Sequence, residues 1–252
     1  MSTVAGSLAE DRLEWLGRQL LAAGSIAIPD AADALGVSEM TIRRDLAELE
    51  ARGTARRVRG GAKAVGPQTF AERRNTSGRA KSRIAAKLAG LVPDVGVVAF
   101  DASSTVMRLT SALPRARDLT VLTNGPDTFA ALQGAAGITP LLTGGRLDAR
   151  TGSLVGPLAC RGAAQLAVDL FLASAAAVDV ERGTLEATLD EADGKRAVAA
   201  GAAEVVLAVD SSKLATRAGA AGLDWDRIDV IVTELDRRDR RLAPFRSLAR
   251  IV

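Results

Sequence analysis

From Lys81 onward, short apolar segments alternate with segments of helical pattern, and this alternation limits the fold more than any other feature of the chain. Strands that alternate with helices form a largely parallel sheet that helices cover on both faces. The expected strands fall at Val95–Phe100, Leu119–Leu122, Thr139–Leu142, Leu170–Ala173, Val205–Val209 and Val230–Val232. We therefore predict an α/β domain that begins with a helix at Lys81–Leu91.

The first part of the chain carries a different pattern, in which three helical segments precede two extended ones. Leucines at helical spacing predict a first helix at Asp11–Ala23, and a short second helix at Asp30–Leu35 ends at Gly36. Ser38 is a favourable N-cap for a third helix at Glu39–Arg52. A short helix, a tight turn and a longer helix have the spacing of a helix-turn-helix motif.

The third helix has two different faces. An apolar stripe that runs from Ile42 to Leu49 should pack against the first two helices. The opposite face and its flanks carry small, polar and basic side chains, which suit the major groove of DNA, where an arginine can bond both acceptors of a guanine. The residues that we expect to contact DNA from this helix and its cap are Ser38, Met40, Thr41, Arg43 and Arg44.

Two extended segments, Thr54–Arg57 and Ala62–Val65, follow the third helix and flank a Gly-Gly pair. A pair of strands in this position predicts the wing of a winged helix-turn-helix domain. Arginines in a wing suit phosphates or a narrow minor groove. The wing residues that we expect to contact DNA are Arg56, Arg57 and Arg59.

Basic residues are concentrated beside this motif. Between Ala51 and Lys87 there are eleven lysines and arginines and one acid, Glu72, although the whole chain has a net charge of only +3. A basic block next to a mildly acidic body favours a polyanionic partner. Together with the helix-turn-helix spacing, the block predicts binding to double-stranded DNA; a solvated charged linker is the alternative.

The chain is expected to divide into a winged helix-turn-helix domain at residues 1–65, a linker at residues 66–80 and the α/β domain at residues 81–252. Gly66–Arg79 has the polar residues, glycine and proline that are typical of a hinge. We expect this linker to couple the two domains.

The sequence contains no histidine and no tyrosine, and its one cysteine is Cys160. These absences exclude zinc sites built from histidine and cysteine, and nucleophilic triads that use histidine. We expect no catalytic residue, no metal and no cofactor, and we interpret Cys160 as a small core residue, with a redox sensor as the alternative. No apolar stretch is long enough to span a bilayer, and Met1–Asp11 has no signal-peptide pattern, so we predict a cytoplasmic protein without membrane contact.

Several predicted strands end in glycine or small polar residues. In open α/β sheets, ligands bind at the carboxyl ends of the strands. The segment from Asp101 to Thr105 offers amides and hydroxyls to an anion, and Lys213 can supply a charge to a phosphate. A cap or a turn is the structural alternative at each position. The candidate ligand-binding residues are Asp101, Ser103, Ser104, Thr105, Asn124, Gly144, Gly145 and Lys213.

The motif Val37-Ser38-x-x-Thr41-Ile42-Arg43-Arg44-Asp45-Leu46, followed by Arg57-Val58-Arg59-Gly60-Gly61-Ala62, closely resembles the N-terminal signature of DeoR-type bacterial transcription regulators. The resemblance continues to about Thr233 through the strand-end motifs and the helix that carries Glu191 and Lys195. It implies a Rossmann-like effector domain, similar to ribose-5-phosphate isomerase, that binds phosphorylated sugars. It also adds Asp179, which precedes Gly183, to the candidate effector-binding residues.

The chain departs from the family pattern at several positions. The family usually has histidine where Arg59 stands, glycine where Ser103 stands and threonine where Val106 stands, and Ala173–Ala177 lacks a family glycine. Losing glycine adds side-chain atoms where a ligand would approach, which predicts a narrower or different effector pocket.

These observations support three hypotheses. The first is a repressor of sugar metabolism genes that a phosphorylated sugar releases from its operator, and that reads two half-sites as a homodimer or homotetramer. The second is a ligand-independent DNA-binding regulator with a degenerate pocket. The third is a sugar-phosphate isomerase that would use Asp101, Asp179 or Asp210 as its base. The resemblance implies that the protein is not an enzyme.

Overall fold

The computed structural model describes residues 9–52, 54–64, 69–113, 116–215 and 218–252. The chain forms two compact units, Met1–Arg73 with Ala149–Thr151, and Arg74–Asp148 with Gly152–Val252. Within the segment that we expect to be a linker, the structure contains α4 (Phe70–Asn75) and the first residues of α5 (Gly78–Ala89). The expected strand end at Val65 and residues 66–68 of the expected linker lie outside the described residues.

The N-terminal unit contains the predicted winged helix-turn-helix. Its elements are α1 (Ala9–Ala23), β1 (Ser25–Ala27), α2 (Ile28–Leu35), α3 (Glu39–Ala51), β2 (Ala55–Val58) and β3 (Gly61–Ala64). α2 ends at Leu35 and α3 begins at Glu39, as the sequence predicts, because Gly36 adopts the left-handed conformation after α2 and Ser38 caps the start of α3. The strands form an antiparallel sheet in the order β1-β3-β2.

The three helices of this unit share one apolar core. Leu16 of α1 and both Ile42 and Leu46 of α3 are fully buried, as the apolar stripe of the third helix predicts. β1 was not predicted, because three residues are too few to show an alternating pattern. Its contact with β3 is close: a Cβ atom at Gly61 would lie 2.0 Å from the carbonyl oxygen of Ile26, so this crossing requires glycine.

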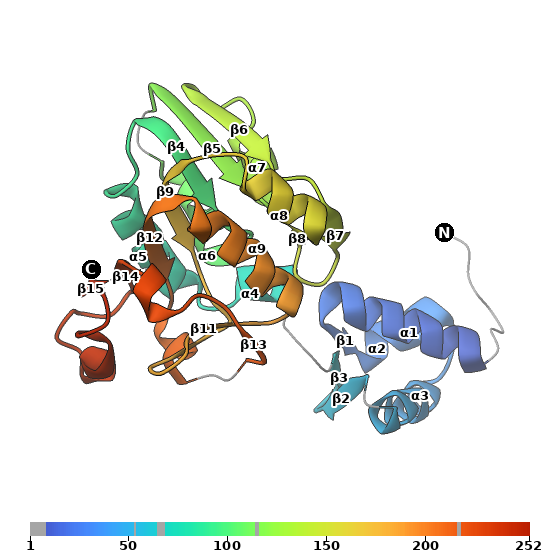
Figure 1. Cartoon of the computed structure of the whole chain (residues 1–252). Coiled ribbons are helices and arrows are strands. Elements are labelled where there is room, and N and C mark those ends of the chain that lie inside the picture. The colour runs from blue at the N-terminus through green and yellow to red at the C-terminus, as the bar shows by residue number, and fades with distance from the viewer. Residues whose placement is uncertain (1–8, 53, 65–68, 114–115, 216–217) are drawn as a thin grey trace. The chain divides into compact units, whose positions relative to one another are not determined.

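The larger unit contains the predicted parallel sheet. Its seven described strands are parallel and lie in the order β15-β14-β12-β9-β4-β5-β6 (Figure 1). They are β4 (Val95–Phe100), β5 (Asp118–Thr123), β6 (Ile138–Leu142), β9 (Val168–Ala173), β12 (Ala202–Ala208), β14 (Val230–Val232) and β15 (Arg250–Ile251). All six strands expected from the sequence are present, which confirms the α/β fold.

Helices cover both faces of this sheet, and an apolar core lies on each side. One core joins the sheet to α5, α6 (Ser104–Met107), the 3₁₀ helix η1 (Arg108–Ser111) and α7 (Pro126–Leu132). The other joins it to α9 (Leu189–Ala200) and to the segment near Phe245. Figure 1 shows α8 (Pro157–Ala163) beside α9. The carboxyl ends of β4 and β5 therefore open toward α8 and α9.

Short hairpins and 3₁₀ helices that the sequence pattern does not predict connect these elements. Their bounds are β7 (Arg146–Asp148), β8 (Ser153–Val155), β10 (Ala177–Asp179), β11 (Gly183–Glu186), η2 (Ser211–Ala215), β13 (Ala220–Ala221), η3 (Trp225–Arg227) and η4 (Arg240–Phe245). Among the described residues, no helix is both long and apolar enough to cross a membrane.

Candidate DNA interface and effector cleft

The N-terminal end of α3 presents the predicted DNA-contacting residues. Ser38 Oγ accepts a hydrogen bond from the Thr41 amide at 3.2 Å and lies 3.0 Å from Thr41 Oγ1, so both side chains are held at the start of the helix. Met40 is 73% exposed, the largest value among the exposed large apolar side chains of the described residues. An unbranched apolar side chain that is open to solvent at this position can contact a thymine methyl group.

Charge is distributed unevenly along α3. In the N-terminal half, Arg43 pairs with Glu39 at 2.9 Å, while Arg44 is exposed and has no ion pair among the described residues. The C-terminal half carries the carboxylates of exposed Glu48 and half-buried Glu50, which already pair with Arg52 and Arg57, and phosphates would compete with those carboxylates for the arginines. The N-terminal half, where the helix dipole is also positive, is therefore the half that can enter the groove.

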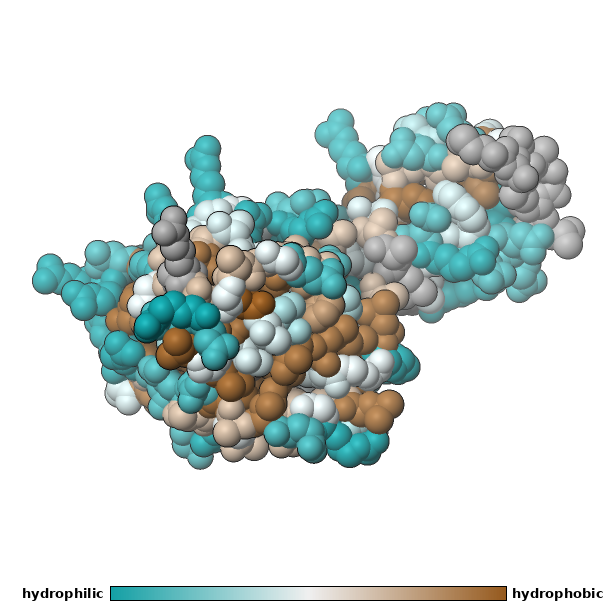
Figure 2. All heavy atoms as spheres, turned by 90° about the horizontal axis from the view of Figure 1, so that it is seen from above, coloured by the Kyte–Doolittle hydropathy of each residue, from teal (hydrophilic) through white to brown (hydrophobic). Residues whose placement is uncertain are grey.

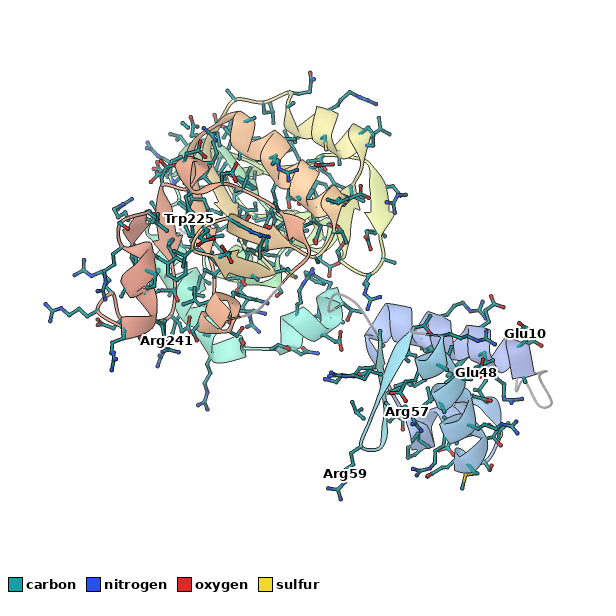
Figure 3. All side chains as sticks on the ribbon, turned by 60° about the horizontal axis from the view of Figure 1, so that its bottom comes forward. Glu10, Glu48, Arg57, Arg59, Trp225 and Arg241 are labelled. Atoms are coloured by element: carbon teal, nitrogen blue, oxygen red, sulfur yellow. The ribbon has the colours of Figure 1, made fainter. Side chains whose placement is uncertain are left out.

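The wing arginines differ from one another. Glu50 of α3 makes two contacts with Arg57. Its carboxylate accepts a hydrogen bond from the Arg57 amide at 2.9 Å and lies 2.6 Å from Nε of the guanidinium. These two hydrogen bonds lower the pKa of Glu50. Arg56 and Arg59 are exposed, with no ion pair in the described part of the chain, and Figure 3 shows Arg59 projecting from the end of the wing. Arg59 is thus available to a phosphate, whereas Arg57 already has a carboxylate partner.

A cleft lies at the carboxyl ends of β4 and β5, as the parallel fold predicts. It is lined by polar groups of Asp101, Thr123, Asn124, Thr143 and Lys195, and by apolar side chains of the sheet, α8 and α9. The structure therefore brings two of the predicted effector residues, Asp101 and Asn124, to one cleft. Asn124 Nδ2 donates to the carbonyl oxygen of Leu154, which fixes the orientation of the amide.

A buried ion cluster forms one wall of this cleft. Lys195 Nζ lies 2.6 Å from Glu186 Oε2 and 3.5 Å from Asp101 Oδ2, and it donates to the carbonyl oxygen of Ser174. Burial disfavours the ammonium ion, but the carboxylates outweigh burial and raise the pKa of Lys195 to about 12. Glu186 Oε1 has no hydrogen-bond partner among the described residues. The cluster therefore ties the ends of β4, β9 and β11 to α9.

The segment after Asp101 is held by its own side chains. Asp101 accepts hydrogen bonds from the amides of Ser103 and Ser174, at 3.0 and 2.7 Å. Ser103 Oγ accepts the Val106 amide and caps α6, and Lys81 Nζ donates to Ser104 Oγ at 2.9 Å. Several groups predicted to cradle an anion thus already have internal partners.

The remaining predicted effector residues lie outside the lining of this cleft. Asp179 accepts the amides of Glu181 and Arg182 in the turn between β10 and β11. Gly144 and Gly145 both have positive φ angles in the turn before β7. The other positions are Thr105, buried in α6, and Lys213, half-buried in η2.

Two family descriptions match this chain. The DeoR-like helix-turn-helix domain matches residues 12–68, and the DeoR C-terminal sensor domain matches residues 76–235. The chain belongs to the DeoR family. It is therefore a DNA-binding transcriptional regulator with a sensor domain, and the predicted resemblance is confirmed.

Curated DeoR-family relatives align with most of the chain. The HTH-type transcriptional regulator GlpR of Haloferax volcanii is 35% identical, over 82% of each chain. The putative aga operon transcriptional repressor of Escherichia coli O157:H7 is 30% identical, over 89% of this chain and 86% of the relative. The glycerol-3-phosphate regulon repressor of Escherichia coli K12 is 27% identical, over 84% of this chain and 85% of the relative.

Solved structures are more distant. Ribose 5-phosphate isomerase A from Methanocaldococcus jannaschii aligns at a TM-score of 0.36 and 16% identity, over 53% of this chain and 52% of that chain. The probable sor operon regulator from Shigella flexneri aligns at a TM-score of 0.39 and 13% identity, over 67% of this chain and 86% of that chain. Similarity at this level carries no functional argument.

The structure gives a physical reason for one departure from the DeoR pattern. Ser103 has a φ of −79°, a conformation that any residue adopts, and its hydroxyl caps α6. Serine therefore replaces the backbone freedom of glycine with a capping hydrogen bond. In the alanine run, Ala173 and Ala177 are fully buried, so their methyl groups fill the interior of the α/β unit.

Glu186 and Lys195 belong to no site predicted from the sequence. Lys195 was noted only as part of a family motif, and Glu186 lies at the end of a strand that was not predicted. A buried carboxylate in an apolar surrounding requires a charged partner, so recognising β11 would have pointed to this pair.

Cys160 lies half-buried on α8 rather than fully in the core. Burial, together with the nearby Asp193 and Asp190, raises the pKa of the thiol. A raised pKa reduces the thiolate fraction, which disfavours the redox-sensor alternative.

Proposed function

We propose that this DeoR-family protein represses sugar metabolism genes and leaves its operator when a phosphorylated sugar binds at the strand ends. The observation that carries this proposal is that one chain combines an exposed basic helix end with a cleft that holds Asp101, Asn124 and Lys195 at the carboxyl ends of parallel strands. The name of the aga operon repressor supports the repressor role, and the name of the glycerol-3-phosphate regulon repressor supports a small phosphorylated metabolite as the effector. It would act in the cytoplasm.

The effector would lie across the carboxyl ends of β4 and β5. Asn124 would meet sugar hydroxyls, and the amides and hydroxyls of residues 103–105 would meet the phosphate. Because several of these groups have internal partners, binding would require them to exchange those partners for the ligand. Such an exchange would give the ligand different affinities for two conformations of the chain, which regulation requires.

The repressor would be a homodimer or homotetramer, because one winged helix contacts too little DNA for tight specific binding. Exposed leucines of the α/β unit support self-association. They are Leu141 and Leu142 on the edge strand β6, Leu147 on β7, Leu158 on α8 and Leu189 on α9. Figure 2 shows sizeable apolar areas on one face of the α/β unit.

A thermal-shift series tests the effector. A panel of phosphorylated sugars would be added to the full chain, with the unphosphorylated sugars and inorganic phosphate as controls. A ligand at about 100 times its dissociation constant stabilises a protein by about 2.7 kcal/mol, which gives a clear shift in Tm. The same compound should release the protein from duplex DNA that the protein itself selects from a randomised library. Selection of DNA without any thermal shift would favour the ligand-independent regulator.

The environment of the candidate bases supports a regulator rather than an isomerase. Asp101 accepts the Ser103 and Ser174 amides, Asp179 accepts two amides of its turn, and Asp210 accepts the Ser212 amide. At least one oxygen of each carboxylate is thus already occupied by backbone amides of its own segment, whereas a catalytic base needs that oxygen to reach the substrate proton. Turnover of ribose or hexose phosphates would contradict this part of the proposal.

A further inference from the structure

The motif that contains Arg43 and Arg44 also contains Asp45, a charged residue without a predicted role. Asp45 is 4% exposed and lies against Arg12 of α1, which is 8% exposed. Arg12 Nε lies 2.8 Å from Asp45 Oδ2, and Arg12 Nη2 lies 3.3 Å from Oδ1. Two parallel hydrogen bonds of this kind fix the orientation of both groups.

The position of Asp45 on α3 gives this contact a geometric consequence. The buried stripe of α3 consists of Ile42, Leu46 and Leu49, and contacts between aliphatic side chains have little directionality. Asp45 lies at the flank of that stripe, directly after Arg44 in the sequence. The Arg12–Asp45 pair is therefore a directional contact that can fix the rotation of α3 about its own axis.

Small rotations of α3 matter at the DNA. A rotation of about 20° moves an atom ~7 Å from the helix axis by roughly 2.5 Å, a distance set by helix geometry. Binding groups need to stay within about 0.5 Å and about 10–20° of their working geometry. A rotation of α3 by that amount is thus large enough to break a bidentate contact from Arg44 to a base.

The energetics of buried ion pairs point in the same direction. Removing two charges from water costs nearly as much as their attraction returns, so replacing both partners with apolar residues is often neutral or stabilising. The pair must then be valuable for something besides net stability, and it joins α1 to the helix that carries the base-contacting residues.

We propose that the Arg12–Asp45 ion pair is a positioning device for base recognition, which sets the rotation of α3 and contributes little to net stability. The proposal rests on the proposed function, operator binding, and on the N-terminal half of α3 as the part that contacts bases. Arg12 and Asp45 are positioning residues, since they act through Arg44 and Met40 and do not contact the DNA.

The test compares two charge-neutral double variants of the full chain. R12M/D45L replaces the buried pair, and the control R52M/E48L replaces an exposed pair at the C-terminal end of α3, where Arg52 follows the helix and Nε lies 2.9 Å from Glu48 Oε1. Dissociation constants are measured on the duplex that the wild-type protein selects from a randomised library and on a scrambled duplex of equal length. Urea unfolding of each protein is measured in parallel.

We expect R12M/D45L to unfold at the wild-type urea midpoint or above it and to bind the scrambled duplex normally, because its net charge is unchanged. Its affinity for the selected duplex should fall about ten-fold or more, which corresponds to losing one good base contact. The control should keep the wild-type ratio of the two affinities. A merely structural role for the pair would not separate specific from non-specific binding.

A wild-type affinity ratio in R12M/D45L would overturn the proposal, and so would loss of its cooperative unfolding, because the pair would then be needed for stability. D45N adds a milder test, since it keeps one oxygen acceptor for Arg12. We expect D45N to fold, and we expect its ratio of selected-duplex to scrambled-duplex affinity to fall several-fold. A folded D45N with the wild-type ratio would also count against the proposal. If the wild-type chain selects no sequence at all, it is the proposed function that fails.

Discussion

The structure predicts that two neighbouring wing arginines contribute very differently to DNA binding. Arg59 is exposed and has no ion pair among the described residues, whereas the guanidinium of Arg57 lies 2.6 Å from the carboxylate of Glu50. Each contacted phosphate adds about 0.9 to the slope of log affinity against log salt concentration. Arg59→Ala should therefore lower this slope by about 0.9. When the salt concentration rises four-fold, the fold-loss of affinity should be about 3.5 times smaller for the variant than for the wild-type protein.

The matched control is Arg57→Ala/Glu50→Ala, which removes one charge of each sign and leaves the net charge unchanged. We expect it to keep the wild-type slope to within about 0.3, because a paired arginine releases no counterion. Both slopes can be measured by fluorescence anisotropy on a scrambled duplex, between about 50 mM and about 200 mM salt. The reasoning is refuted if Arg59→Ala leaves the slope unchanged. It is equally refuted if the neutral pair flattens the slope as much as Arg59→Ala, since Arg57 would then leave Glu50 for a phosphate.

Three further outcomes are expected. Arg44→Ala should reduce discrimination between selected and scrambled duplexes by about 1–3 kcal/mol in competition binding, and Arg18→Ala, on the exposed face of α1, should not. Leu46→Ala should lower the free energy of unfolding by about 2–5 kcal/mol in urea, because Leu46 is fully buried, and a smaller loss would mean that the core closes over the cavity. Burial opposes ionisation of Glu234, but hydrogen bonds with Ser211 and Thr233 lower its pKa overall. Its stabilising contribution is therefore present above its unfolded pKa of about 4.3 and is lost as the pH falls through the lower folded value. Wild-type urea midpoints should thus fall more than those of Glu234→Gln on acidification, and equal falls would contradict this account.

Local features of the sequence predicted the DNA-binding elements well. A serine that can cap a helix, a glycine that can end one, and an apolar stripe at helical spacing act within a few residues of the position they define. The third helix was expected at Glu39–Arg52 and is found at Glu39–Ala51. The strands Val95–Phe100 and Val230–Val232 were predicted with their observed bounds, because continuous apolar runs mark strands that are buried on both faces, as all of Val230–Val232 and the second half of Val95–Phe100 are.

Elements that exist only through pairing were not predicted. β1 and β13 contain three and two residues, and each is a strand because it lies beside another one, β3 and β11 respectively. Too few residues show no period, so no signal within such a segment distinguishes it from a loop.

The sequence by itself determined that this chain would have a helix suited to the major groove and a parallel sheet with polar strand ends. Only the tertiary structure decided which charged side chains are held in ion pairs and which remain available to DNA or to a ligand. It joins Arg12 to Asp45, Arg57 to Glu50, and Lys195 to two carboxylates that come from other elements. The physical reason is that an ion pair depends on the distance between two groups in space, and partners up to 94 residues apart, such as Asp101 and Lys195, leave no pattern along the chain.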